Sequence, residues 1–247
     1  MLLVNHNILM SSAEINIEKD IKAMNLIQKI DLTREIFSRC LGLGNPENIF
    51  AAWTGGKDST VLIHQWASFL REIDPLMRAK ALNLDTGYKF PEIIEFRNKM
   101  AMKWQINLLI IRPQVNDQKT AINESKVECC RKLKIEPLKK AVRENSVQAL
   151  LTGIRRDEHA SRLNAETLEE KTDPRYWQIN PIAHWTEMDI WSYIVSRSLP
   201  YCSLYDQGYR SLGCMPCTAR DSDSHERAGR DPEKESSLNL LRSMGYF

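Results

Sequence analysis

The feature that most constrains the fold is an alternation of short apolar runs with longer amphipathic stretches. Four runs have the length of buried strands, at about 49–53, 79–84, 107–111 and 147–152. Helical spacing of apolar residues follows the first run, and helices are predicted over 91–104 and 136–145. This order predicts an α/β fold with a doubly wound, mostly parallel sheet. Ligands of such sheets bind at the carboxyl ends of the strands, so the loops after strands are where a site is expected.

Helical extensions are predicted on both sides of this unit. Apolar residues at three- and four-residue spacing predict a helix from Ile15 to Leu41, and Thr186 is a candidate N-cap of a later helix. The sequence after Cys217 is polar and predicts a mobile tail before a short amphipathic stretch at 238–244. The expected organisation is an N-terminal helical extension over 1–45, one α/β domain over 46–217 and a polar tail with a short helix over 218–247.

Composition excludes some classes of protein. The 34 Lys and Arg residues nearly balance 32 Asp and Glu, which argues against binding nucleic acid through bulk positive charge alone. No run approaches the ~20 apolar residues of a membrane span, and the first residues lack a basic region before an apolar run. We therefore expect a soluble cytoplasmic protein. In that compartment, six cysteines are expected to be metal ligands, reactive thiols or core residues rather than disulfides.

A glycine pair lies where the first predicted strand turns into a helix, in the string Thr54-Gly55-Gly56-Lys57-Asp58-Ser59-Thr60. Backbone N–H groups of two glycines can approach phosphate oxygens, and the helix N-terminus adds positive potential. Lys57 supplies a charge, and Ser59 and Thr60 supply hydroxyls for phosphate or Mg²⁺. The alternative for Gly-Gly before a helix is an ordinary turn, and the spacing differs from a Walker A motif. In this context the string predicts a phosphate-binding loop.

Arginines follow the fourth predicted strand and Gly153. Arg155, Arg156 and Arg162 can hold phosphate or sulfate oxygens in bidentate fashion. The alternative is a solvated face paired with the neighbouring Asp157 and Glu158.

Asp85 and Thr86 follow the second predicted strand. The Asp85 carboxylate is expected either to bind ribose, adenine or Mg²⁺, or to cap a turn. Both roles remain open from the sequence.

Four cysteines form a pair of pairs, Cys129-Cys130 and Cys214-x-x-Cys217. Adjacent side chains on a helix point about 100° apart, so a double cysteine suits a bulky cluster that accepts ligands from a broad arc. A Cys₄ zinc site, which usually takes two Cys-x-x-Cys pairs, and four buried thiols are the alternatives. Cys40 and Cys202 lack partners at ligand spacing and are expected in the core.

These motifs together resemble the phosphoadenosine-phosphosulfate (PAPS) reductase superfamily of PP-loop ATP pyrophosphatases. The string at 54–59 is similar to the PP-loop, and segments at 84–92, 153–162 and 180–191 resemble later motifs of PAPS reductases and of the small subunit of sulfate adenylyltransferase. The resemblance covers about 49–217 and implies catalytic roles for Lys57, Asp58, Arg155 and Arg156. It implies phosphate or sulfate binding by Arg155, Arg156 and Arg162. The implied ATP-binding residues are Trp53, Thr54, Gly55, Gly56, Lys57, Asp58, Ser59, Thr60, Asp85, Thr86 and Gly153.

The cysteine pattern resembles the assimilatory adenylyl-sulfate reductases, which implies a [4Fe–4S] cluster on Cys129, Cys130, Cys214 and Cys217. Those reductases use a thiol in a C-terminal tail and commonly lack the loop lysine, whereas this sequence has Lys57 and no cysteine after Cys217. The resemblance therefore implies cleavage of Mg·ATP to AMP and pyrophosphate. The adenylylated acceptor oxygen would then receive sulfur, as in the four-cysteine enzymes of DNA phosphorothioation.

Partners implied by this function are a cysteine desulfurase as sulfur donor and a nucleic-acid acceptor, DNA rather than tRNA; a homo-oligomer is also allowed. The alternatives are sulfate activation in the manner of the sulfate adenylyltransferase small subunit, and thiol-dependent reduction of adenylyl sulfate or PAPS. A non-catalytic nucleotide-sensing subunit is a further alternative.

Overall fold

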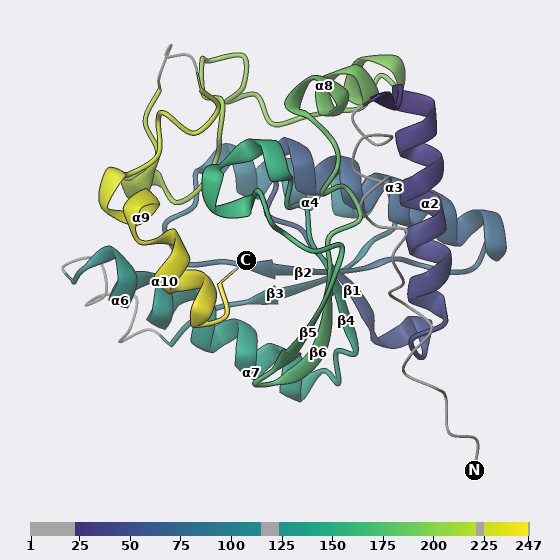
Figure 1. The fold of residues 1–247 in the computed structure, drawn as a ribbon, viewed down its shortest axis with the longest axis horizontal. Helices are drawn as coiled ribbons and strands as arrows, with labels where there is room; N and C mark the ends of the chain where they lie inside the picture. Colours follow the sequence, from purple (N-terminus) through teal and green to yellow (C-terminus); the bar gives the residue numbers. More distant parts are fainter. Residues whose placement is uncertain (1–22, 115–123, 221–224, 247) are drawn as a thin grey trace.

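The computed structural model describes residues 23–114, 124–220 and 225–246, and its centre is a six-stranded sheet (Figure 1). The strand order is β3-β2-β1-β4-β6-β5, with β5 antiparallel to β6 and every other pair parallel. The strands are β1 Ile49–Ala52, β2 Lys80–Leu84, β3 Asn107–Ile111, β4 Ala149–Leu151, β5 Leu168–Thr172 and β6 Arg175–Ile179. The predicted α/β fold is confirmed, and the hairpin of β5 and β6 is an addition that the sequence did not predict.

Helices cover both faces of the sheet, as doubly wound folds require. One face packs against α2, α3, α4 and α8 through a core that includes Phe37, Trp66, Met100 and Ile190. The other face packs against α7, whose Leu138 and Val142 contact Phe50 and Leu150. The helices are α2 Leu26–Leu41, α3 Lys57–Ile73, α4 Pro91–Lys103, α6 Lys126–Cys130, a π-helical turn Arg131–Ile135, α7 Glu136–Glu144, α8 Glu187–Ser196, α9 Pro232–Ser236 and α10 Leu238–Ser243, with 3₁₀ turns at Pro46–Asn48, Arg156–Glu158, Ala160–Arg162 and Met215–Cys217. Within the described ranges no helix has the length and apolar character needed to cross a bilayer.

The N-terminal helix is shorter than predicted. Asn25 caps α2, because its Oδ1 accepts from Gln28 N at 3.1 Å while Gln28 Oε1 accepts from Asn25 N at 2.9 Å. Residues 24 and 25 are not helical, so a continuous helix from Ile15 to Leu41 is wrong; residues 15–22 lie outside the described residues. The predicted cap of α8 is confirmed, since Thr186 and Asp189 form a reciprocal capping box.

The short amphipathic stretch predicted at 238–244 contains the helix α10, whereas the polar stretch before it, expected to be mobile, is folded over 225–237. Residues 225–246 include α9 and α10 (Figure 1), which contact α6. Leu238 and Leu241 of α10 are buried. The polar composition that suggests disorder belongs instead to side chains such as Glu226, which is buried and forms ion pairs inside the molecule. Buried charges are stable only with such partners, so this segment is part of the folded domain.

An ion pair joins α2 to α8. Lys29 on α2 is 5% exposed, and its Nζ lies 2.5 Å from Asp189 Oδ2. Nearby, Thr33 Oγ1 accepts a hydrogen bond of 3.0 Å from Trp185 Nε1, so a polar layer lies within this apolar contact. Both charges of the pair are shielded from water, so removing either one would leave the other without a compensating charge.

Replacing Lys29→Met should lower the free energy of unfolding by about 2–4 kcal/mol, because Asp189 then keeps a largely buried charge without its cation. The matched control is Arg39→Met, which removes a pair with Glu35 whose side chains are 66% and 56% exposed. That change should cost less than about 0.5 kcal/mol. Urea denaturation of the three proteins measures both effects, and equal losses would contradict the importance of the buried pair.

Candidate active site

The loop between β1 and α3, residues 53–56, brings the helix N-terminus to the carboxyl edge of the sheet. Gly56 is the N-cap of α3, and Gly55 has φ of 87°, a left-handed conformation that favours glycine. Ser59 Oγ accepts from Thr54 N at 3.2 Å and lies 3.0 Å from Gly56 O, to which it donates. These bonds hold the loop against the first turn of α3, as a phosphate-binding loop requires.

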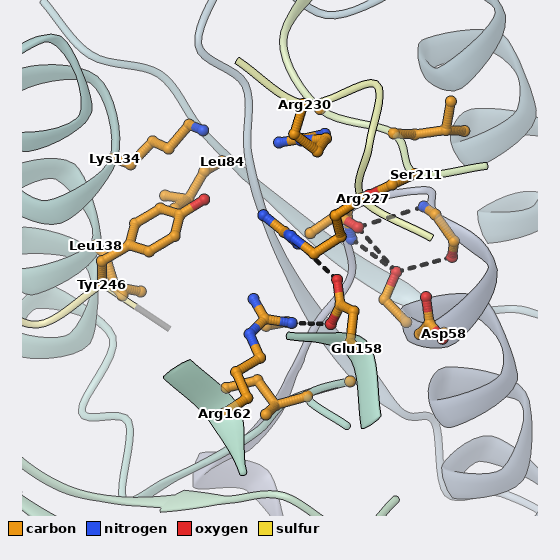
Figure 2. A pocket seen from close by; sticks show the side chains of 18 of the residues that line it. Asp58, Leu84, Lys134, Leu138, Glu158, Arg162, Ser211, Arg227, Arg230 and Tyr246 are labelled. Atoms are coloured by element: carbon orange, nitrogen blue, oxygen red, sulfur yellow. Dashed lines mark hydrogen bonds and ion pairs between the residues drawn. The ribbon is translucent and has the colours of Figure 1, made fainter. Parts of the chain in front are cut away.

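A cavity opens at this edge of the sheet, and we call it the main cavity (Figure 2). The loop and the first turn of α3 form one side, and residues after β2 and β4 contribute from the sheet. Segment 225–230 and the C-terminal residues close it. Its polar and glycine lining includes Thr54, Gly56, Asp58, Ser59, Lys89, Lys134, Gly153, Glu158, Arg162, Ser211, Gly213, Arg227, Arg230 and Tyr246.

A buried ion-pair network lies beneath the loop. Lys57 is 1% exposed, and its Nζ pairs with Glu226 Oε1 and lies 3.5 Å from Asp58 Oδ2. Arg155 is fully buried; its Nε donates to Asp58 Oδ1 at 2.6 Å, its Nη1 donates to Asp157 Oδ1 at 2.6 Å and its Nη2 pairs with Glu226 Oε2. Glu226 therefore bridges the two cations.

The charges of this network stabilise one another. Burial opposes the charged form of Lys57, but Asp58, Tyr205 and Glu226 raise the pKa of its ammonium above the ordinary value. Burial likewise opposes ionisation of Asp58, but Lys57 and Arg155 lower its pKa. Both groups are thus charged at neutral pH.

Further cations line the cavity, Lys89, Lys134 and Arg230, and with the buried Lys234, which lies near Lys134 and Arg230, we call them the cation wall. In the described part of the chain, none of the four lies within ion-pair distance of a carboxylate. Arg230 is 6% exposed, and its Nε is buried without a hydrogen-bond partner. Burial lowers the pKa of Lys89 to about 8. Cys214 and Tyr246 raise the pKa of the Lys134 ammonium against the effect of burial. The wall therefore faces a thiol and a phenol rather than carboxylates, and its positive charge favours binding of an anion.

Tyr246 and two arginines complete this side. Burial would raise the pKa of Tyr246, but Lys134 and Lys234 lower it to about 7, and Lys234 Nζ donates to its hydroxyl at 3.0 Å. Figure 2 shows Lys134 and Tyr246 across the cavity from Asp58. It also shows Glu158 between Arg162 and Arg227, with Arg227 Nη1 2.6 Å from Glu158 Oε1. Burial and then Arg227 lower the pKa of Arg162 to about 10.

Most residues expected at the site are brought together. Thr54, Gly56, Asp58, Ser59, Gly153 and Arg162 line the main cavity, and Lys57 and Arg155 lie in the network beneath it.

Other expected residues have structural contacts instead. Trp53 and Thr60 bond to each other in the core, with 3.1 Å between Nε1 and Oγ1. Arg156 Nε donates to Ala165 O at 2.9 Å and does not line the cavity. Asp85 Oδ1 accepts from Gly87 N at 3.2 Å, which is the turn-capping alternative.

Five residues at the site were not expected from the sequence: Glu226, Arg227, Arg230, Lys134 and Tyr246. Three of them, Glu226, Arg227 and Arg230, belong to the polar stretch that was expected to be mobile, because such a composition is typical of disorder. The available signal was the charge cluster Glu226-Arg227-x-x-Arg230, which concentrates both signs within a few residues.

The four paired cysteines line a second cavity, together with Tyr88, Lys126, Leu133, Lys134 and Pro216. Thr86 Oγ1 lies 3.3 Å from Cys214 Sγ. Burial would raise the pKa of the Cys214 thiol, but Lys134, Lys89 and the Thr86 hydrogen bond lower it to about 6. Lys134 lines both cavities, so the cysteines adjoin the cation wall.

The donor set fits a polynuclear cluster. In residues 23–114, 124–220 and 225–246, no three Cys, His, Asp or Glu side chains are arranged to hold a single metal ion. The four thiols that line one cavity equal in number the thiolates that hold an iron–sulfur cluster. Cys40 and Cys202 are each 1% exposed and line neither cavity, which confirms them as core residues.

Replacing Gly55→Ala should destabilise the protein by about 2–4 kcal/mol, because its positive φ and a clash each carry a cost. A Cβ at this position would lie 2.6 Å from Ile93 Cγ2. The matched control is Gly56→Ala, whose Cβ would meet Thr54 and Tyr205 at 3.4 Å and whose φ of −75° suits any residue. Thermal denaturation measures the stability of both variants. The loop geometry is wrong if Gly56→Ala lowers the stability as much as Gly55→Ala does.

Comparison with known proteins agrees with this architecture. The model of the phosphoadenosine phosphosulfate reductase domain matches residues 48–220. An adenosine 5′-phosphosulfate reductase from Geobacillus kaustophilus is 31% identical over 193 residues, which cover 74% of this chain and 79% of that protein.

Solved structures share the fold. A PAPS reductase from Candida auris, solved as a phosphate complex, has a TM-score of 0.62 at 20% identity, covering 85% of this chain and 99% of that one. A U34-tRNA thiolase from Methanococcus maripaludis, solved with its [4Fe–4S] cluster, has a TM-score of 0.55 at 15% identity, covering 88% and 74%.

The matched domain spans the sheet, the loop and all four paired cysteines, and the reductase similarity extends over most of both chains. This chain therefore belongs to the phosphoadenosine phosphosulfate reductase domain family and is an enzyme of sulfur metabolism.

Proposed function

We propose that the main cavity binds an adenine sulfonucleotide, adenylyl sulfate or its 3′-phosphate, and presents its sulfur to a thiol for reduction to sulfite. The observation that carries this proposal is the cation wall of Lys89, Lys134 and Arg230, which has no carboxylate partner in the described residues. The reductase names of the relatives favour this function, which the sequence offered only as an alternative, over DNA phosphorothioation.

The two sides of the cavity suit the two ends of a sulfonucleotide. The N-terminus of α3 and the hydroxyls of Thr54 and Ser59 offer donors to oxygens of the nucleotide. The cation wall offers positive charge to the phosphosulfate oxygens, and within the described residues its cations have no carboxylate partners that would compete for them. The same charges stabilise the negative charge that develops on the departing phosphate.

The reaction consists of two exchanges at sulfur. A thiolate attacks the sulfur of the nucleotide, an S–S bond forms, the S–O bond to phosphate breaks, and AMP leaves with the electron pair. A second thiolate then attacks the thiol sulfur of this S-sulfo adduct, giving a disulfide and sulfite. Because four cysteines line the second cavity and Cys40 and Cys202 are buried, both thiols belong to a dithiol reductant.

The second cavity is proposed to hold a [4Fe–4S] cluster through Cys129, Cys130, Cys214 and Cys217. The cluster when bound carries net negative charge with its four thiolates. Lys134, which lines both cavities, then couples that charge to the cation wall.

A second candidate is cleavage of ATP to AMP and pyrophosphate, with Mg²⁺ as cofactor and a nucleic-acid acceptor supplied with sulfur by a cysteine desulfurase. One observation favours it: Lys57 is the first residue of α3, where a cation can neutralise a departing pyrophosphate.

In the presence of a dithiol, the purified protein should convert adenylyl sulfate or PAPS to sulfite. Lys134→Met should lower the rate by at least about 100-fold, since it removes a preorganised charge from the cation wall. Lys140→Met is the control, because that side chain is 66% exposed on α7. Sulfite and nucleotide products are measured together. Release of pyrophosphate from ATP that Lys57→Met abolishes, with no sulfite from either sulfonucleotide, would establish the second candidate instead.

Protein isolated without oxygen should be brown and contain about four irons per chain with acid-labile sulfide. Serine at any one of Cys129, Cys130, Cys214 or Cys217 should remove the colour, and Cys40→Ser should retain it because that thiol lies in the core. Analysis of iron, acid-labile sulfide and zinc in the protein distinguishes the cluster from a zinc site. A colourless protein with stoichiometric zinc would disprove the cluster.

A further inference from the structure

Glu226 reaches the phosphate-binding loop from a distant part of the sequence. Its side chain is 7% exposed, and its two oxygens pair with Lys57 Nζ and Arg155 Nη2. Among the carboxylates near Lys57 it is the closest, since Asp58 lies at 3.5 Å and Glu187 at 3.9 Å. A carboxylate with both oxygens on cations makes the kind of contacts that two oxygens of a bound phosphate would make.

The loop side of the cavity consequently has no spare positive charge. Lys57 and Arg155 are surrounded by the carboxylates of Asp58, Asp157, Glu187 and Glu226. A pyrophosphate group at the loop would need the cations that Glu226 holds and would meet its like charge at short range. The cation wall has the opposite character, because its charges lack carboxylate partners in the described residues.

One short segment contributes both to the saturated charges at the loop and to the cation wall. Glu226 and Arg230 lie on segment 225–230, which is held by a bridge between Thr218 and Arg230 and by a hydrogen bond of 2.7 Å from Ala219 N to Gly229 O. Gly213 leaves room for Arg230, since a Cβ there would lie 2.2 Å from its Nη1. The geometry that directs Arg230 to the cavity thus also places Glu226 on Lys57.

We propose that Glu226 is a specificity-determining residue, an internal carboxylate that occupies the pyrophosphate position of the loop. With segment 225–230 in place, the site accepts a sulfonucleotide, whose single phosphosulfate group meets the cation wall. The site does not bind ATP or pyrophosphate until the Glu226 carboxylate moves away from Lys57 and Arg155. This inference rests on the proposed function, since it assigns the substrate class of the same cavity.

Calorimetric titration of the full chain with pyrophosphate, ATP and adenylyl sulfate tests this role. Glu226→Gln should tighten the binding of pyrophosphate and ATP by at least about tenfold, because a like charge leaves the loop. Adenylyl sulfate affinity should change by less than about threefold, since the cation wall is retained. Adding Lys57→Met to this variant should remove the gain.

The matched control is Glu235→Gln, which neutralises another largely buried carboxylate after segment 225–230. Glu235 Oε2 lies 2.7 Å from Arg227 Nε, so this carboxylate pairs with Arg227 and not with Lys57. The control should leave the preference between ATP and adenylyl sulfate unchanged. A folded Glu226→Gln protein with the wild-type preference would overturn the proposal.

Hydrogen exchange of the wild-type protein supplies a test that needs no variant. Adenylyl sulfate should slow exchange in peptides that contain residues 225–230, whereas ATP at high concentration should accelerate it as Glu226 withdraws. ATP that binds as tightly as adenylyl sulfate, with exchange unchanged, would contradict the proposal.

The two proposals can fail separately. If Glu226→Gln binds pyrophosphate more tightly but neither the wild-type protein nor the variant binds adenylyl sulfate, Glu226 excludes pyrophosphate from the loop and the proposed substrate is wrong. If adenylyl sulfate binds and the variant gains nothing, the proposed function stands and the role of Glu226 is wrong.

Discussion

The bridge that Glu226 forms between Lys57 and Arg155 is the interaction on which the rest of the site depends. It connects the start of α3, the segment after β4 and the C-terminal segment, which are far apart in the sequence. Removing one partner of such a network leaves a buried charge uncompensated, which is strongly destabilising. The C-terminal segment is therefore held to the domain by electrostatics as well as by burial of Leu238 and Leu241.

The bridge also divides the cavity into two unlike halves. Carboxylates saturate the cations at the loop, while Lys89, Lys134 and Arg230 remain without such partners in the described residues. An anion that enters the cavity can accept charge-assisted hydrogen bonds from these cations, which no carboxylate of the described residues occupies. The same lysines lower the pKa of Cys214, so anion binding and the state of the cysteine cavity are electrostatically connected through Lys134.

The strands that could be predicted from the sequence are those whose side chains are mostly apolar on both faces of the sheet. Buried parallel strands are continuous apolar runs, so the four central strands were evident, whereas β5, with the sequence LEEKT, lies at the sheet edge and carries no such signal. The direction in which a side chain points could not be predicted from its residue type. Arg155 is extended, with φ of −123° and ψ of 144°, so Arg155 and Arg156 diverge, and only the former enters the ion-pair network. The folding of the polar stretch 225–237 was missed because composition cannot distinguish charges that face water from charges buried in pairs.

The loop lysine illustrates why a motif alone does not decide the reaction. A lysine at the start of α3 is suited to a departing pyrophosphate, and on that ground ATP cleavage was the expected function. Its ammonium is instead 1% exposed and held by Glu226, so the charge that the motif supplies is already neutralised within the chain. The positive charge still available to a ligand lies on the opposite wall, at residues that no loop motif contains. Which anion the cavity accepts is thus set by the partner of Lys57 rather than by Lys57 itself.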